Sequence, residues 1–449
     1  MNLPGFRLSY KISLTLFLIF LFSFTDLTQR NAPPFSQWTV LNNLPFTQEY
    51  QVTAAWRYQD TNFIITAGGR INGTTGNFVV IYNTATGQYR PLPPMPVPLE
   101  RAGGFILEDS LYIVGGSTNT GNTFSNALYK LNLTSNGPWV NRANYPNPIG
   151  EITYSTKSRN DSLAYVAGGK NNVNPVNNVF LYNGKQNIWV PANNLPTPGI
   201  FGAGLSFVED NFLMFIGGKS NDSAHSLCFF GLINPGNPSI INWSAGPVYP
   251  GGKVYNLGNW GSKDGRVFFT GGESVFPLDN RATDKTYMFE MGEGFDTLSD
   301  KPTPITHSQI DGFIIDTTST GYEYEVYAPG GFDGSSATNK HEKLFVLDSL
   351  PTSIQPVTND IPAGFKLYQN FPNPFNPETK ILLDVPLRST VTLNIYSSEG
   401  RLIRTVINKI LNAGTYEVTI NGKNLPSGIY FYTLISDEWK ETKRMVLLK

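Results

Sequence analysis

The sequence predicts an all-β fold, in which a six-bladed β-propeller is followed by a small β-sandwich. A pair of adjacent glycines ends a strand-like run six times, at steps of 47 to 59 residues. Such a period indicates repeated supersecondary units. Aromatic residues make up 13% of the chain, and 43 glycines and 32 prolines supply turns between short strands. The last 85 residues, 365–449, carry short alternating strands without the glycine pairs, which favours a separate sandwich.

The bulk composition excludes several classes of protein. Net charge is −1 and charged residues are only 15% of the chain, so nothing indicates a nucleic-acid partner. The single cysteine, Cys228, excludes an internal disulfide framework and a cysteine-cluster metal site. A chain of 449 residues is long enough to be held by a large core instead.

The first 30 residues have the layout of a secretory signal peptide. Arg7 and Lys11 precede an apolar run over 12–24, and polar residues follow from Asp26. The run is shorter than the roughly 20 apolar residues that span a bilayer. An uncleaved membrane anchor is the alternative. No other segment is apolar and long enough to cross a membrane, so we expect no transmembrane segment in the mature chain.

The repeat over residues 36–348 has four parts. Each glycine pair is followed by a polar loop, a third strand, an outer strand with an aromatic residue and a crossing that contains proline. The pairs are Gly68–Gly69, Gly115–Gly116, Gly168–Gly169, Gly217–Gly218, Gly271–Gly272 and Gly330–Gly331. This order of features resembles the kelch repeat of galactose-oxidase-type propellers. The resemblance implies a six-bladed kelch-like β-propeller.

The last repeat lacks an outer strand, and the sequence offers a replacement at its other end. Residues 36–45, which include Trp38, have the pattern of an outer strand and crossing with no blade before them. We therefore expect this segment to complete the sixth blade, which would remove an open sheet edge.

The carboxyl-terminal part differs in composition from the repeats. Residues 349–364 are rich in Pro, Thr and Ser and are predicted to form a linker. The motifs QNFPNPFNP (369–377), VTLNIYSSEGR (391–401), LPSGIYFYTL (425–434) and the terminal KRMVLLK resemble the type A C-terminal sorting domain of the type IX secretion system. The resemblance implies that residues 365–449 engage the type IX secretion machinery. It also implies a Gram-negative, Bacteroidetes-type cell and export through the periplasm to the medium or the outer cell surface. An ordinary β-sandwich adhesion module is the alternative.

No catalytic residue, metal site or cofactor site is predicted. The three histidines lack metal-ligand spacing, and nucleophile elbows and phosphate loops are absent. Copper radical oxidases also use kelch blades, but Cys228 lies in an apolar third strand, which favours a buried structural cysteine. The periplasmic sialic acid mutarotases also have a six-bladed kelch ring. A sugar-modifying enzyme of this mutarotase or epimerase type is therefore the alternative to a non-catalytic binding module.

The predicted ligand site lies at the mouth of the central channel. In kelch rings, the crossing loops and the loops after each glycine pair open on one face. Aligning the residues after each crossing predicts a ring of Tyr50, Arg101, Glu151, Phe201, Lys253 and His307, with Arg70 and Lys170 added by the loops that follow the glycines. The same loops bring Lys219, Glu273 and Asp333.

Those residue types suit a glycan or protein ligand. An arginine such as Arg101 presents a planar fork of donors, a carboxylate such as Glu151 accepts from hydroxyl groups, and aromatic rings stack on sugar faces. The alternative is that these charges are merely solvated, or that Arg101 and Glu151 pair with each other across the channel. We expect a secreted, non-catalytic module that recognises a glycan or a protein.

Overall fold

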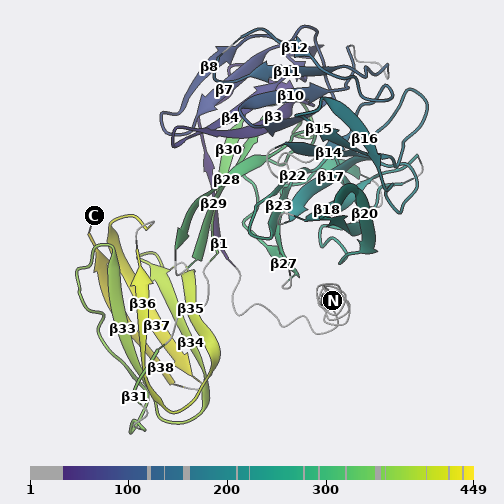
Figure 1. Cartoon of the computed structure of the whole chain (residues 1–449). Helices are drawn as coiled ribbons and strands as arrows, with labels where there is room; N and C mark the ends of the chain where they lie inside the picture. Colours follow the sequence, from purple (N-terminus) through teal and green to yellow (C-terminus); the bar gives the residue numbers. More distant parts are fainter. Residues whose placement is uncertain are drawn as a thin grey trace, which may run out of the picture.

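The computed structural model describes residues 34–448 except 119–122, 136, 155–161, 209–210, 222, 277–278, 292–293, 319–320, 349–354, 359–360, 401, 423–424 and 437–438. The predicted signal peptide, 1–30, lies outside the described residues. Every regular element in the described part is a β-strand (Figure 1). Among the described residues, no helix has the length and apolar character needed to cross a membrane.

Six antiparallel four-stranded sheets form the blades (Figure 1). From the axis outward, blade 1 is β3 (Val52–Tyr58), β4 (Thr61–Ala67), β7 (Val79–Asn83) and β8 (Gln88–Leu92); blade 2 is β9 (Gly103–Leu107), β10 (Ser110–Val114), β11 (Leu128–Asn132) and β12 (Val140–Asn141); blade 3 is β13 (Thr153–Tyr154), β14 (Leu163–Ala167), β15 (Val179–Asn183) and β16 (Ile188–Ala192). Blade 4 is β17 (Phe201–Val208), β18 (Phe212–Lys219), β19 (Cys228–Asn234) and β20 (Asn237–Ala245); blade 5 is β22 (Gly258–Gly261), β23 (Arg266–Thr270), β26 (Thr286–Glu290) and β27 (Gly294–Thr297); blade 6 is β28 (Asp311–Thr318), β29 (Gly321–Pro329), β30 (His341–Asp348) and β1 (Phe35–Val40).

The inner strands close into a circle. Each inner strand contacts the inner strand of the next blade, and β28 of blade 6 contacts β3 of blade 1. The count of six, expected from the glycine pairs, is therefore the count around the axis. A closed ring removes the exposed edges that a linear stack of sheets would carry.

Blade 6 takes its outer strand from the amino-terminal segment. β1 pairs antiparallel with β30, with Trp38 opposite Leu344. The Trp38 indole N–H donates to the carbonyl of Ser299, in the crossing from blade 5, at 2.9 Å. The outer-strand tryptophans of blades 2, 3 and 4 make the same kind of bond to the crossing before their own blade: Trp139 to Pro93, Trp189 to Ala143 and Trp243 to Asn193.

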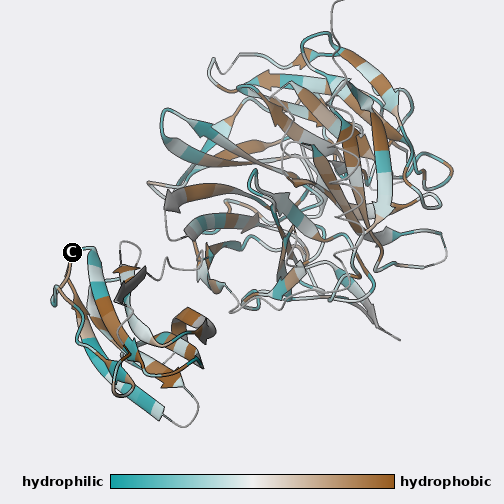
Figure 2. Ribbon diagram, turned by 60° about the horizontal axis from the view of Figure 1, so that its bottom comes forward, coloured by the Kyte–Doolittle hydropathy of each residue, from teal (hydrophilic) through white to brown (hydrophobic). Residues whose placement is uncertain are grey.

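The hydrophobic core of the propeller is divided among the blade interfaces. Strand residues alternate between the two faces of a blade, and both faces are covered by neighbours, so the inner strands are apolar on both sides. Separate clusters of buried residues lie between each pair of adjacent blades. Figure 2 shows the apolar stretches running along the strands. Among the described residues, the cluster between blades 6 and 1 is the smallest, with Ile64, Tyr82, Phe313 and Tyr327 at its centre.

The glycine pairs join each blade to the next one. All twelve of these glycines have φ between 60° and 103°, a region that favours glycine. In blade 2, the Gly115 N–H donates to the carbonyl of Ala127, directly before the third strand of its own blade. The Gly116 N–H donates to Ile149 in the crossing to blade 3. The glycine pair therefore ends the second strand of blade 2 and holds the crossing to blade 3 by a hydrogen bond.

Two small three-stranded sheets lie where the chain enters blades 1 and 5. The first consists of β2 (Gln48–Glu49), β5 (Arg70–Ile71) and β6 (Thr74–Thr75); the second consists of β21 (Val254–Tyr255), β24 (Glu273–Phe276) and β25 (Asp279–Ala282). Their registers place Glu49 opposite Arg70 and Tyr255 opposite Glu273. Residues directly opposite in such a pair share one face of the sheet, so each sheet presents a polar pair.

The carboxyl-terminal part is a sandwich of two four-stranded sheets. One has the order β31 (Gln355–Thr358), β36 (Gly414–Asn421), β33 (Glu378–Val385) and β32 (Lys366–Leu367). The other has the order β35 (Leu402–Leu411), β34 (Ser389–Ser397), β37 (Gly428–Ser436) and β38 (Trp439–Leu447). Their inward residues form a single apolar core. The predicted linker, 349–364, needs a correction, because β31 lies within it as an edge strand paired with β36. The sequence did not predict this strand because it contains Pro356, and proline is tolerated in a sheet only at an edge.

Candidate functional site

A closed ring of backbone hydrogen bonds surrounds the axis at the mouth of the channel. One residue from each blade takes part, and its N–H donates to the carbonyl of the equivalent residue in the preceding blade at 2.6–3.3 Å. In order, these residues are Tyr50, Arg101, Glu151, Gly202, Asn256 and His307, and the Tyr50 N–H donates to His307 to close the circle. We call these six residues the mouth ring.

Every member of the mouth ring has a left-handed backbone. The φ angles lie between 50° and 62°. Only one of the six is glycine, although this conformation costs about 1–2 kcal/mol for other L-residues. Bulky side chains kept in an unfavourable backbone conformation are typical of functional sites. The ring therefore presents five side chains that a purely structural turn does not need.

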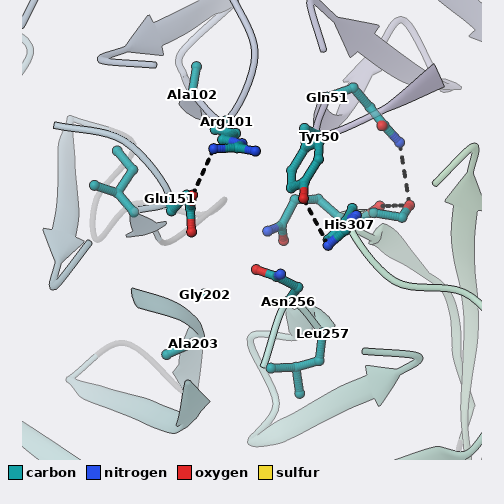
Figure 3. A pocket seen from close by; sticks show the side chains of 13 residues that line it. Tyr50, Gln51, Arg101, Ala102, Glu151, Gly202, Ala203, Asn256, Leu257 and His307 are labelled. Atoms are coloured by element: carbon teal, nitrogen blue, oxygen red, sulfur yellow. Dashed lines mark hydrogen bonds and ion pairs between the residues drawn. The ribbon is translucent and has the colours of Figure 1, made fainter. Parts of the chain in front are cut away.

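A cavity of about 50 Å³ opens at the centre of the mouth ring. All six ring residues line it, together with neighbours such as Gln51, Ala102, Ile152 and Leu257 (Figure 3). This space holds only a few water molecules or the edge of a small polar ligand. Its wall is polar at Arg101, Glu151 and His307 and apolar around Ala203 and Leu257, so it suits a ligand with polar and apolar faces.

Tyr50 lies between two cationic groups. Its ring stacks on that of His307 with centroids 3.9 Å apart, and the Arg101 guanidinium carbon is 4.7 Å from the Tyr50 centroid. The Tyr50 hydroxyl is 3.0 Å from His307 Nε2. Burial raises the pKa of the phenol, and Glu151, Glu49 and Glu273 add to this rise. Tyr50 is therefore held rigidly as a neutral hydroxyl group facing the cavity.

His307 bridges the two small sheets. Its Nδ1 is 3.3 Å from Glu49 Oε2, and its Nε2 is 2.6 Å from Glu273 Oε1. Burial by itself would lower the pKa of His307, but the hydrogen bonds to Glu273 and Glu49 outweigh it and raise the pKa above its usual value. Burial opposes ionisation of Glu273 as well, yet bonds from His307 and Tyr255 lower its pKa. The arrangement favours an imidazolium between two carboxylates.

Two arginines continue this network through blades 1 and 2. Arg70 binds Glu49 at 3.1 Å and Glu100 at 2.9 Å. Arg101 lies 3.2 Å from Glu151 and 3.7 Å from Glu100. The ion pair between Arg101 and Glu151, which the sequence offered as the alternative to a ligand site, is therefore present. Both of its residues also line the cavity.

The structure places four of the predicted site residues on the cavity wall: Tyr50, Arg101, Glu151 and His307. Arg70 stands behind them as the partner of Glu49 and Glu100. Lys170 lies over the ring of Phe201, with Nζ 5.8 Å from its centroid, and does not line the cavity. Among the loop residues, Glu273 reaches the network, while Lys219 covers the Tyr255 ring.

Two predicted ring members need correction. The ring position of blade 4 is Gly202, one residue after Phe201, and that of blade 5 is Asn256, three residues after Lys253. Lys253 is exposed, and Phe201 packs edge-on to Tyr255 at the start of β17. The crossings into blades 4 and 5 differ in length from the others, so alignment from their prolines shifted the register.

Sequence analysis missed Glu49, Glu100, Gln51 and Tyr255. Each of them directly precedes or follows a residue of the mouth ring, or pairs with a loop residue, as Tyr255 does with Glu273. The sequence did contain one indication of these residues, because a polar residue stands beside the ring position in each of the first two blades. Within the part of the chain that the structure describes, no group of three or more His, Cys, Asp or Glu side chains is placed to hold a metal ion.

Three comparisons with known proteins bear on the two parts of the chain. Residues 369–448 match the family described as "Secretion system C-terminal sorting domain". The chain is 30% identical over 178 residues to the "Kelch-like protein terF" of Aspergillus terreus (strain NIH 2624 / FGSC A1156), a match that covers 37% of this chain and 38% of that protein. The chain thus matches well under half the length of this relative.

A solved structure titled "Structure of YjhT" is similar in fold. It superposes with a TM-score of 0.54 at 16% sequence identity, covering 71% of this chain and 97% of that one. At this identity the likeness concerns the fold alone. Together with the sorting-domain match and the kelch-like relative, it confirms both resemblances drawn from the sequence.

Proposed function

We propose that this chain, a kelch-type β-propeller joined to a type IX sorting domain, is a secreted recognition module that binds a glycan at the mouth ring. One observation carries the proposal. Four polar or aromatic side chains, those of Tyr50, Arg101, Glu151 and His307, are held in left-handed backbone conformations around one cavity. The cavity accepts a small polar group, which fits the end of a glycan better than the flat surface of a protein.

Replacing Arg101 and Glu151 together by glycine is expected to weaken glycan binding strongly without loss of stability. Glycine adopts φ near 55° readily, so it relieves strain at both positions while it removes the ion pair. We expect binding to weaken at least tenfold in calorimetry with the best hit of a glycan array. The midpoint of urea unfolding should stay the same or rise.

The matched control is the double alanine variant, Arg101→Ala with Glu151→Ala. It removes the same side chains but keeps the backbone strain at both positions, so it should lose binding equally and be less stable than the double glycine variant by about 2–4 kcal/mol. Unchanged binding in both variants would show that the ligand site lies elsewhere.

The sorting domain supports export through the type IX pathway to the medium or the cell surface. Deleting residues 361–449 removes both sheets of the sandwich apart from β31, and should leave the propeller in the periplasm. Immunoblots of periplasm, outer membrane and medium from the natural host would measure this. Surface appearance equal to that of the full chain would contradict it.

A second candidate function is proton transfer on a bound sugar, as in a mutarotase or epimerase. The hydrogen-bonded set of Glu273, His307 and Tyr50 favours it, because an acid and a base with opposed environments lie within one site. Exchange spectroscopy of the anomeric protons of a bound sugar separates the two functions. Only the enzyme accelerates anomer exchange, and His307→Gln should then abolish the acceleration.

A further inference from the structure

The wall of the cavity is polar on one side and apolar on the other. Each blade lines it with its mouth-ring residue and the residue that follows. In blades 1 and 6 the following residue is polar, whereas blades 2 to 5 contribute Ala102, Ile152, Ala203 and Leu257. The polar residues, Gln51 and Ser308, share one side because blades 6 and 1 are neighbours, and Figure 3 shows Gln51 across the opening from Ala203. A bound ligand therefore meets hydrogen-bonding groups on one side and hydrocarbon on the other.

Gln51 is 2% exposed, and its side-chain amide has a fixed orientation. Its Nε2 donates to the carbonyl of Pro329, on blade 6, at 2.6 Å. A backbone carbonyl only accepts hydrogen bonds, so the oxygen of the amide is turned away from it. This oxygen, Oε1, has no hydrogen-bond partner among the described residues. Burying an acceptor without a donor is unfavourable, so this side of the cavity favours a ligand that brings an O–H or N–H group.

The polar character continues from Gln51 along the face of blade 1 that meets blade 6. Val52 packs in the cluster shared with blade 2, so its neighbours in the chain, Gln51 and Thr53, face blade 6. Thr66 lies opposite Thr53 in the register of β3 and β4, and both hydroxyls are buried without a partner among the described residues. At the position of Thr66, two residues before the glycine pair, blade 2 has Ile113 in an apolar cluster. The polar side of the cavity is therefore part of a polar interface and does not depend on one glutamine alone.

The charged groups on the cavity wall are already paired. Arg101 lies 3.2 Å from Glu151. His307 lies 3.3 Å from Glu49 and 2.6 Å from Glu273. A charged ligand group would lose its hydration and compete with one of these pairs, whereas a neutral hydroxyl group does not. The cavity of about 50 Å³ also admits only a small group, so the site favours a small neutral group that carries a hydrogen-bond donor.

We propose that the mouth ring selects a neutral sugar and that Gln51 is its specificity-determining residue, because Oε1 accepts the hydrogen of one sugar hydroxyl. This inference rests on the proposed glycan binding and names its ligand class. A hydroxyl both donates and accepts, so it satisfies Gln51 while it accepts a hydrogen bond from the Tyr50 phenol. The apolar C–H face of the sugar packs on the opposite wall, formed by Ile152, Ala203 and Leu257.

Calorimetry with matched monosaccharides tests the ligand class. D-glucose, D-galactose and D-mannose are compared with the corresponding uronates and 2-amino sugars at about pH 6, where the uronates are ionised and the amines protonated. We expect the best neutral hexose to bind at least tenfold more tightly than its charged counterparts. Among the monodeoxy analogues of that hexose, the one that lacks the hydroxyl bound by Gln51 should bind at least tenfold more weakly, because it leaves Oε1 without a donor.

A pair of variants connects this hydroxyl to Gln51. Gln48 is the matched control, because it is also buried in blade 1, its Nε2 donates to the carbonyl of Gly68 at 2.6 Å and its Oε1 has no partner among the described residues. It is not one of the residues that line the cavity. In Gln51→Met, the affinity ratio of the hexose to its sensitive deoxy analogue should fall below about threefold, whereas in Gln48→Met it should stay at about tenfold or more. A purely structural role of Gln51 would weaken the binding of both sugars equally and preserve the ratio.

The outcomes separate this inference from glycan binding itself. Charged sugars that bind as tightly as the neutral hexose, or a ratio that persists in Gln51→Met, would overturn the inference and leave glycan binding standing. If Gln51→Met does not fold, the monodeoxy series with the unaltered protein still decides, because equal affinity for all of its members would contradict a buried acceptor at the site. No binding of any sugar, here and on the array, would overturn the proposed function as well.

Discussion

A mature chain that begins at Thr47 is expected to lose the cooperative unfolding of the intact propeller, with a loss of stability on the order of 5 kcal/mol or more. This truncation removes β1, the outer strand of blade 6, and the buried Leu44 of the crossing. The measurement is differential scanning calorimetry of the two chains side by side. Equal melting temperatures would show that β1 does not close the ring.

The size of this effect follows from what β1 covers. Lys301 and Glu342 form an ion pair that is almost completely buried, and the Trp38 ring lies 5.5 Å from Lys301 Nζ. Burial lowers the pKa of Lys301, although Glu342 opposes this. A buried charge pair is stable only while its surroundings satisfy it. Without Trp38, water reaches the pair and the interface between blades 5 and 6 loosens.

The interface between blades 6 and 1 also depends on the amino-terminal segment. His341 is fully buried among Tyr82, Tyr89 and Tyr327, and burial lowers its pKa to about 3. Leu41 N–H donates to the His341 carbonyl at 2.8 Å, directly after β1. Loss of the segment therefore also exposes His341, which the folded protein buries in its neutral form.

A permuted chain provides the control for the truncation. Phe35 lies opposite Leu347, so a turn of two or three residues can join Asp348 to Pro34. A propeller that begins at Thr47 and carries residues 34–46 after Asp348 should recover the stability of the intact protein. Recovery would show that the strand matters, and not its position in the chain.

The closure was predictable because its signal is local and repeated. Six glycine pairs count the blades, and an outer-strand pattern around Trp38 without its own blade indicates where the ring closes. The indole bond of Trp38 to Ser299 repeats those of Trp139 and Trp189. Strong local patterns of this kind can be recognised in a sequence because they reflect contacts within one repeated supersecondary unit.

The site was predictable only in part, because its geometry depends on loop lengths. Alignment from the prolines found Tyr50, Arg101, Glu151 and His307, where the crossings have similar lengths. It failed at Gly202 and Asn256, where the backbone reaches the ring one and three residues later than expected. When a residue other than glycine has a left-handed backbone, the amino-acid sequence does not indicate that conformation.

The ion pairs around the mouth ring could not be predicted from the sequence. Glu49 meets Arg70 within the small sheet of blade 1, whereas Arg70 meets Glu100 because blades 1 and 2 are neighbours, and Glu273 meets His307 across another blade boundary. The two Arg70 contacts join residues 21 and 30 positions apart, and the contact of His307 with Glu49 joins residues 258 positions apart. No periodicity in one sequence indicates them.

Gly115→Ala is expected to destabilise the propeller by about 3 kcal/mol or more. A Cβ at Gly115 would lie 2.3 Å from the Ile149 carbonyl oxygen and 2.9 Å from its Cγ2, and φ is 67°. The backbone strain alone costs about 1 kcal/mol. The rest arises because the crossing to blade 3 must move away, which also breaks the bond from Gly116 N–H to Ile149 at 2.8 Å. Urea unfolding followed by tryptophan fluorescence measures the loss.

Gly73→Ala separates the two causes. Gly73 has φ of 85°, and a Cβ there would have no atom within 4 Å, so its substitution carries the strain without the clash. It should cost about 1 kcal/mol. Hydrogen exchange of Gly115→Ala should show faster opening in blades 2 and 3 together, because the glycine pair joins their backbones. If Gly115→Ala costs no more than Gly73→Ala, the pair ends a strand but does not hold neighbouring blades together.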